Sequence, residues 1–141
     1  MITSAESAIV DVIIPVYRGL DETRRCLDSV LAFPQQTPHA VIAINDCSPE
    51  PELTAWLRQL AGTGAITLLE NPVNTGFVNT VNHGMILHPD RDVVLLNSDA
   101  EVHGDWLDRL RRHAESSTKI GTVTPFSNNA TICSYPRFVQ D

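Results

Sequence analysis

Polar and acidic side chains follow apolar runs at three places in this chain, and together they could hold a charged ligand. Tyr17 comes just after the first run, Asn45-Asp46 follows the second, and Asn97-Ser98-Asp99 follows the apolar residues 93–96. If these runs are parallel strands, their carboxyl ends meet at one edge of the sheet, where open α/β sheets bind ligands. We therefore expect one pocket to contain an aromatic ring, a hydrogen-bond acceptor and a metal ligand.

These three groups suit a nucleoside diphosphate. The ring of Tyr17 can pack on a base, and the carboxylate of Asp46 can accept the ring N–H of uracil, thymine or guanine. Adenine and neutral cytosine lack that N–H, so a carboxylate at this place disfavours them. Asp99 can bind a divalent cation that bridges the phosphate oxygens, since hard cations prefer carboxylate and phosphate oxygen.

Other ways of binding an anion are disfavoured by the sequence. The first apolar run is not followed by G-x-G-x-x-G, and G-x-x-x-x-G-K-[ST] occurs nowhere in the chain. Lys and Arg total 10 against 17 Asp and Glu, which gives a formal net charge of -7. That balance argues against nucleic acid or an anionic membrane as the main partner. A diphosphate must therefore be neutralised locally, and a cation is the expected means.

Strand-like and helix-like segments alternate along the chain. Strands are predicted over residues 9–16, 40–44, 66–69, 93–96 and 120–124. Residues 93–96 have the pattern of a strand buried on both faces. Helices are predicted between the strands, the first capped by Asp21, the second with Pro51 in its first turn, the third over residues 77–87, and the fourth capped by Asp105. This alternation predicts an α/β fold, a three-layer sandwich with a mostly parallel central sheet.

Length and composition indicate a globular chain of modest size. With 141 residues and 43% hydrophobic content, residues 1–141 are expected to form a single domain. The three cysteines show neither a CxxC nor a zinc pattern, which indicates reduced thiols and a cytoplasmic setting. The chain has no signal peptide pattern and no apolar run near the ~18 residues that cross a bilayer. Attachment to the inner face of a membrane would need other segments or partners.

Four stretches in register resemble a known family. VDVIIPVYRG, AINDCSPE, NPVNTGFVNTVNHG and LLNSDAEVHGDWLDRL look like the nucleotide-diphospho-sugar-binding half of family 2 inverting glycosyltransferases with the GT-A fold. The resemblance covers about residues 8–125. It implies a nucleotide-diphosphate sugar donor, a divalent metal (Mg²⁺ or Mn²⁺), and single displacement at the anomeric carbon by the hydroxyl of a glycan or another acceptor.

The resemblance also implies roles for particular residues. Pro15 and Tyr17 would border the base, Asp46 would bond it, and Asn82 and Gly84 would shape the donor loop. Asp99 would be the metal-binding acid of the DXD-type motif, with Asn97 and Ser98 contacting the nucleotide.

Two departures from the family pattern concern acids. Asn45 replaces the first acid of an Asp-Asp pair, and Asn97 replaces the first acid of the DXD-type motif, which weakens metal binding because an amide is neutral. Glu101 would face the same way as Asp99 in an extended chain and so supply a second acid.

A third departure concerns the general base. The family's base lies in the half that follows, so we expect this chain to be the N-terminal part of a longer transferase and a candidate for pairing with a second copy. The alternative is a non-catalytic module that binds a nucleotide-sugar or a partner. A sugar-phosphate nucleotidyltransferase is disfavoured, because Tyr17-Arg18-Gly19 is not a glycine-rich basic loop.

Simpler structural roles stand beside these interpretations. Asp46 and Asp99 would serve equally as loop acids or helix caps, and the ring of Tyr17 as a cover for the core. Trp56 and Trp106 lie in apolar helical stripes and are expected in the core. The five histidines are expected at the surface, and Asn128, Asn129 and Thr131 in a polar loop.

Overall fold

The computed structural model describes residues 9–128. The chain divides into two compact units, residues 1–104 and residues 105–141. The first unit contains the sheet and is described first. Its elements in chain order are β1 (Val10–Val16), α1 (Leu20–Ala32), β2 (His39–Asn45), α2 (Pro51–Gly62), β3 (Thr67–Glu70), α3 (Phe77–Met85) and β4 (Asp92–Leu95). Every predicted strand and helix of this unit is present, with ends shifted by one or two residues.

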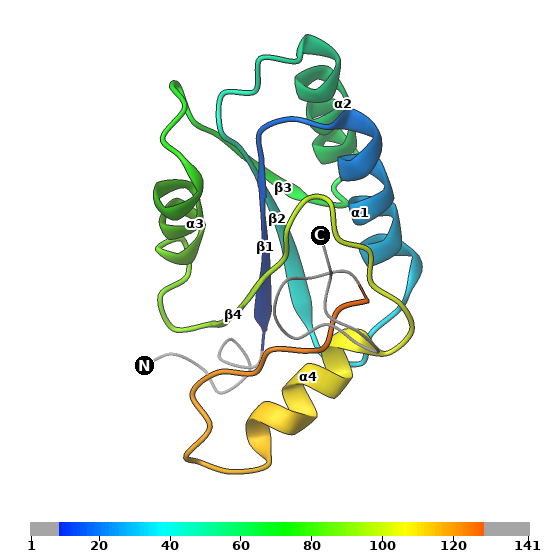
Figure 1. The fold of residues 1–141 in the computed structure, drawn as a ribbon, viewed down its shortest axis with the longest axis vertical. Coiled ribbons are helices and arrows are strands. Elements are labelled where there is room, and N and C mark those ends of the chain that lie inside the picture. The colour runs from blue at the N-terminus through cyan, green and yellow to red at the C-terminus, as the bar shows by residue number, and fades with distance from the viewer. Residues whose placement is uncertain (1–8, 129–141) are drawn as a thin grey trace, which may run out of the picture. The chain divides into compact units, whose positions relative to one another are not determined.

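All four strands of the sheet are parallel, in the order β3-β2-β1-β4. The chain moves outward in one direction from β1 to β3 and then returns to the other side of β1. Because parallel crossovers are right-handed, this reversal puts the connecting helices on opposite faces. Figure 1 shows α1 and α2 on one face of the sheet and α3 on the other. The prediction of an α/β fold with a parallel sheet between helices is confirmed.

The core lies around the two central strands. The side chains of Ile13, Ile42 and Ile44 are fully buried. Helix α3 lies close against them because residue 84 is a glycine: a Cβ there would lie 2.7 Å from Ile44 Cδ1 and 3.0 Å from Ile13 Cγ2. A larger residue at this position would push α3 away from the sheet.

The strand β4 is less buried than the sequence predicts. Its two end residues are exposed and its two middle residues are half-buried, and Leu95 is 50% exposed. The expectation of burial on both faces is therefore wrong for this strand. In the described part of the chain β4 pairs only with β1, so it forms an edge of the sheet. A run of apolar residues does not by itself distinguish an edge strand from a central one.

One predicted cap also differs. Helix α1 begins at Leu20 with Gly19 as its N-cap, so Asp21 lies inside the first turn. Gly19 has a φ of 89°, a left-handed conformation that glycine adopts without strain.

The second unit contains α4 (Trp106–Glu115). Asp105 is its N-cap residue but makes no side-chain cap bond, because its carboxylate accepts a hydrogen bond from Arg109 Nε at 2.7 Å instead. The strand predicted at residues 120–124 is absent, and these residues are irregular and exposed. Only Ile120 and Val123 in this run are large and apolar, and strand formation depends on a pairing partner that a local pattern cannot supply. Among residues 9–128, no helix combines the length and apolarity needed to cross a bilayer.

Candidate functional site

A cavity of about 580 Å³ lies at the carboxyl ends of β1, β2 and β4, where the strand order reverses. This is the place where open α/β sheets bind ligands, and the volume is within the usual range for small-molecule sites. The structure brings six of the eight predicted site residues to its wall: Pro15, Tyr17, Asp46, Asn97, Ser98 and Asp99.

The other two predicted residues, Asn82 and Gly84, lie on α3 and outside the cavity wall. Asn82 is exposed, and Gly84 is buried against the isoleucines of β1 and β2. The close packing of α3 explains the glycine. A contribution of these two residues to the donor loop stays a prediction.

Asp46 is buried, 5% exposed, and is held by the loop that follows β3. Its Oδ1 accepts hydrogen bonds from Asn71 Nδ2 at 2.8 Å, from the backbone N–H of Thr75 at 2.9 Å and from the Thr75 hydroxyl at 3.0 Å. Its Oδ2 accepts one bond, from the backbone N–H of Gly76 at 2.9 Å. Four donors thus fix the carboxylate, and Oδ2 keeps acceptor capacity beside the cavity.

The ionisation of Asp46 follows from these bonds. Burial by itself raises the pKa, but the hydrogen bonds, chiefly those from Asn71 and Thr75, outweigh it and lower the pKa from 3.8 to about 2. Asp46 is therefore a carboxylate at any physiological pH, and it can only accept hydrogen bonds.

Asn71 connects this carboxylate to His83. Because its Nδ2 donates to Asp46, Oδ1 of Asn71 is the atom that faces His83 Nδ1, at 2.8 Å. That oxygen has no proton to donate, so His83 Nδ1 must carry the hydrogen. The hydrogen bonds therefore run in one direction: His83 donates to Asn71, and Asn71 donates to Asp46.

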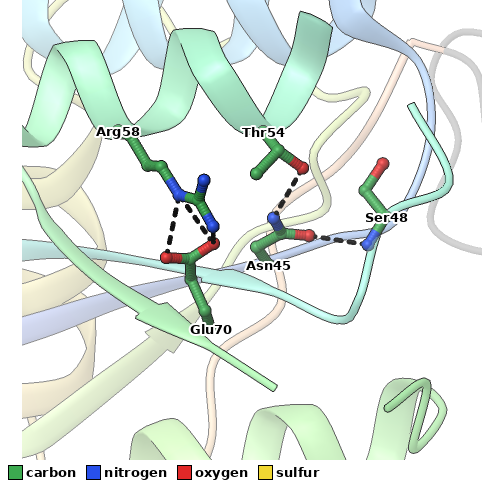
Figure 2. A network of polar contacts seen from close by, with 5 residues as sticks. All are labelled: Asn45, Ser48, Thr54, Arg58 and Glu70. Carbon is green, nitrogen blue, oxygen red and sulfur yellow. Dashed lines mark hydrogen bonds and ion pairs between the residues drawn. The ribbon is translucent and has the colours of Figure 1, made fainter. Parts of the chain in front are cut away.

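Asn45, the neighbour of Asp46, does not line the cavity but holds the following turn. Its Nδ2 donates to the Thr54 hydroxyl at 3.0 Å, and its Oδ1 accepts from the backbone N–H of Ser48 at 2.8 Å; both bonds are drawn in Figure 2. An amide suits this place because it donates and accepts at once. In the same view, Arg58 of α2 makes a bidentate pair with Glu70 at the end of β3, which ties that helix to the sheet.

Asp99 has a different environment. It is exposed, and among the described residues its carboxylate makes no hydrogen bond or ion pair. Helix α1 holds the loop on which it lies. The Cys26 thiol donates to the Asn97 carbonyl at 3.4 Å, and the Ser29 hydroxyl accepts from the backbone N–H of Val102 at 3.0 Å. The loop is anchored at both ends, whereas its acid is free to bind a ligand.

Glu101 does not join Asp99 in the cavity wall. Its carboxylate lies 3.4 Å from the Nε of Arg25 on α1.

Burial, together with the negative charges of Asp99 and Glu101, raises the pKa of the Cys26 thiol to about 12. Cys26 is therefore a neutral thiol with a structural role, and not a nucleophile.

The oxygen donors at this end of the cavity fit a cation that is shared with a diphosphate. Asp99 supplies one carboxylate, Asn97 an amide oxygen and Ser98 a hydroxyl, all in the cavity wall. Within residues 9–128 no cluster of three or more His, Cys, Asp or Glu side chains could hold a metal by itself. Mg²⁺ needs only one or two carboxylates when phosphate and water complete its shell.

Sequence reasoning missed the loop that holds Asp46. Asn71 directly follows β3 and therefore lies at the same edge of the sheet as the other strand-end residues. A search for polar residues directly after the third strand, as after the other strands, would have found Asn71. Thr75 and Gly76 contribute mainly backbone N–H groups, which no residue type reveals.

Comparison with solved structures shows the same fold in larger proteins. TarS from S. aureus, residues 1–349, matches with a TM-score of 0.61 and 17% identity over 75% of this chain and 32% of its own. It has also been solved in complex with UDP-GlcNAc. The mannosyltransferase PcManGT from Pyrobaculum calidifontis, in complex with GDP-Man and Mn²⁺, matches with a TM-score of 0.65 and 22% identity over 77% of this chain and 33% of its own. The chain thus covers about a third of the TarS fragment and of PcManGT, and 19% of the longer TarS chain.

Sequence comparison gives the family. A search among curated proteins found no match. The model of glycosyl transferase family 2, however, matches residues 11–135, which is most of the chain. This chain belongs to glycosyl transferase family 2.

Proposed function

We propose that this chain is the donor-binding part of a glycosyltransferase that takes a nucleotide-diphosphate sugar together with Mg²⁺ or Mn²⁺. The observation that carries the proposal is the convergence of Tyr17, Asp46 and Asp99 in the wall of one cavity. The nucleotide-sugars and Mn²⁺ bound to the solved neighbours support the same class of donor.

In this proposal the base lies on the Asp46 side of the cavity. Oδ2 of Asp46 accepts the ring N–H of uracil, thymine or guanine, while Tyr17, which is 39% exposed, packs on the ring and Pro15 borders it. The carboxylate stays ionised and already receives four hydrogen bonds. It can discriminate against bases without a ring N–H, because a base nitrogen facing it would repel it.

The diphosphate lies on the Asp99 side. Asp99 would hold the cation, Asn97 would hydrogen-bond the ribose, and Ser98 would lie beside them. A cation held there would supply charge neutralisation of the phosphates and Lewis-acid assistance to the leaving diphosphate. The described residues orient the donor so that an acceptor hydroxyl can attack the anomeric carbon from the side opposite the diphosphate. The bond to the diphosphate oxygen breaks as the new C–O bond forms, and the configuration inverts. The general base that takes the hydroxyl proton is expected outside the described residues.

Calorimetric titration tests the donor site. UDP, dTDP and GDP are titrated with and without Mn²⁺ into the wild-type chain and into Asp99→Ala. We expect metal-dependent binding of at least one of them, weakened roughly tenfold or more in the variant, because a carboxylate–metal contact is a strong charge-assisted interaction.

Asp92→Asn is the matched control. Asp92 is an exposed acid at the amino end of β4, whereas Asp99 follows the carboxyl end of that strand, so removing the Asp92 charge should leave binding unchanged. Equal loss of affinity in both variants would indicate a general charge effect and contradict the site. If no nucleotide binds in any condition, the proposed function is wrong. If a nucleotide does bind, an assay for transfer or hydrolysis of the corresponding nucleotide-sugar separates an enzyme from a non-catalytic binding module.

A further inference from the structure

We propose that Arg18 binds the diphosphate of the donor. Its positive charge complements that of a metal ion, which a site with one free carboxylate holds only weakly. The inference rests on the proposed function and adds a residue that neither the motifs nor the family resemblance assigned. It predicts that nucleotide binding survives in part without metal.

Arg18 is the one basic side chain in the wall of the cavity within the described part of the chain. The other arginines of residues 9–104 have other partners. Arg25, Arg58 and Arg91 pair with carboxylates, and the guanidinium of Arg24 lies over the ring of Trp56 at 5.5 Å. With a net charge of -7, the chain as a whole repels an anion, so the local cation decides whether a diphosphate is held.

The position of Arg18 suits an anion that lies next to a stacked base. Its guanidinium carbon lies 5.4 Å from the centre of the Tyr17 ring, so the charge lies beside the ring proposed to pack on the base, and both residues line the cavity. No carboxylate pairs with Arg18 among residues 9–128. A contact with an exposed ring is worth only about 0.5–1 kcal/mol, so the guanidinium can turn to a phosphate at small cost. Its planar fork can then donate two hydrogen bonds to phosphate oxygens.

The acids of the cavity explain why a further cation is needed. Glu22, Asp46 and Asp99 line it, but Asp46 is occupied by its own loop and Glu22 lies 3.7 Å from Arg25. Only Asp99 is free to hold a metal, and a metal with one protein carboxylate is held weakly. A diphosphate bound here needs a second source of positive charge.

The amino end of α1 does not provide that charge. The N-cap residue Gly19 donates its backbone N–H to both carboxylate oxygens of Glu50, at 3.2 and 3.1 Å. Glu50 therefore puts a negative charge at this helix end, which disfavours a phosphate there. Arg18, the preceding residue, is the cation in the cavity wall.

The test compares Arg18→Gln with Arg24→Gln by calorimetry, using UDP and GDP with EDTA and then with saturating Mn²⁺. Arg24 is a matched control because it is close in sequence, exposed, and outside the cavity wall. Without metal, we expect Arg18→Gln to weaken binding roughly tenfold or more, the usual scale for a lost charge-assisted bond. With Mn²⁺ the loss should be smaller, because both cations neutralise the same charge. Arg18→Lys should recover part of the affinity.

Two further readouts distinguish anion binding from a structural role. The metal-free affinity should fall less steeply with salt in Arg18→Gln than in wild type, and the melting temperatures of both variants should match wild type. The inference is overturned if wild type binds the diphosphates but Arg18→Gln and Arg24→Gln bind alike without metal. If wild type binds no diphosphate under either condition, the proposed function fails, and the inference with it.

Discussion

Asp46 and Asp99 follow the two strands that flank β1, yet their environments are opposite. Asp46 is 5% exposed and receives four hydrogen bonds from the loop after β3. Asp99 is exposed, and the described residues give its carboxylate no partner. The first acid is therefore part of the folded structure, whereas the second is left for a ligand. The comparison indicates that the fold holds the Asp46 side of the cavity, proposed for the base, in place, whereas it leaves the acid on the Asp99 side, proposed for the diphosphate, without a partner.

The largest expected effect is on stability when Asp46 becomes Asn. The pKa of Asp46 falls from 3.8 to about 2 on folding, which corresponds to about 2 kcal/mol of the free energy of unfolding. The amide would also present an N–H₂ group to donors. Because the folded pKa is the lower one, this contribution is full above about pH 4 and is lost as the pH falls toward 2.

Urea unfolding at pH 7 and at a series of lower pH values measures this effect. Asp46→Asn should lose about 2 kcal/mol or more at neutral pH, and the gap from wild type should narrow as the pH falls below 4. A gap that is constant with pH would contradict the ionised, hydrogen-bonded state of Asp46.

Ser29→Ala should have the next largest effect, because it releases the loop that carries Asp99. The Ser29 hydroxyl accepts from the backbone N–H of Val102 at 3.0 Å and donates to the Cys26 carbonyl at 2.7 Å. Its loss leaves a partly buried N–H without this partner and should cost about 1–2 kcal/mol. Hydrogen exchange should become faster at Val102. Unchanged exchange there would show that α1 does not hold the loop.

Cys47→Gly should stabilise the protein. Cys47 has a φ of 54°, a left-handed conformation that costs an L residue roughly 1 kcal/mol and glycine little. Thermal unfolding should show a rise for Cys47→Gly but none for Cys47→Ala, which keeps the Cβ. If both variants gain equally, the thiol and not the backbone is responsible.

Asp99→Asn should have the smallest effect on stability, within about 0.5 kcal/mol of wild type, as is usual for a surface substitution away from a packed or bonded feature. The contrast with Asp46→Asn is the direct test of the comparison. A large loss of stability in Asp99→Asn would show that its carboxylate is bonded within the protein.

The sequence predicted most of the fold because local patterns determine most of it. Buried runs, helical spacing and Pro51 located the strands and helices of the first unit. The sequence patterns failed where the burial or the pairing of a strand depends on residues distant in sequence. The exposure of β4 follows from its place at the edge of the sheet, and residues 120–124, predicted as a strand, have no pairing partner among residues 9–128.

The candidate site was predicted in its main residues but not in its supports. The rule that strand ends meet at one edge brought Tyr17, Asp46 and Asp99 together. It did not show that Asp46 is held by Asn71, a partner 25 residues away, or that Cys26 anchors the loop of Asp99 from 71 residues away. Such hydrogen bonds depend on tertiary geometry, which residue types and spacing leave open.

The most direct test of one shared site is paramagnetic broadening of backbone amide NMR signals by Mn²⁺, measured with UDP or GDP present and absent. We predict that the signals of residues 97–101 and of Tyr17 broaden strongly only when the diphosphate is present. Residues 88–92 lie before and at the amino end of β4, and their signals should not broaden. Broadening centred elsewhere, or the same with and without diphosphate, would contradict the account.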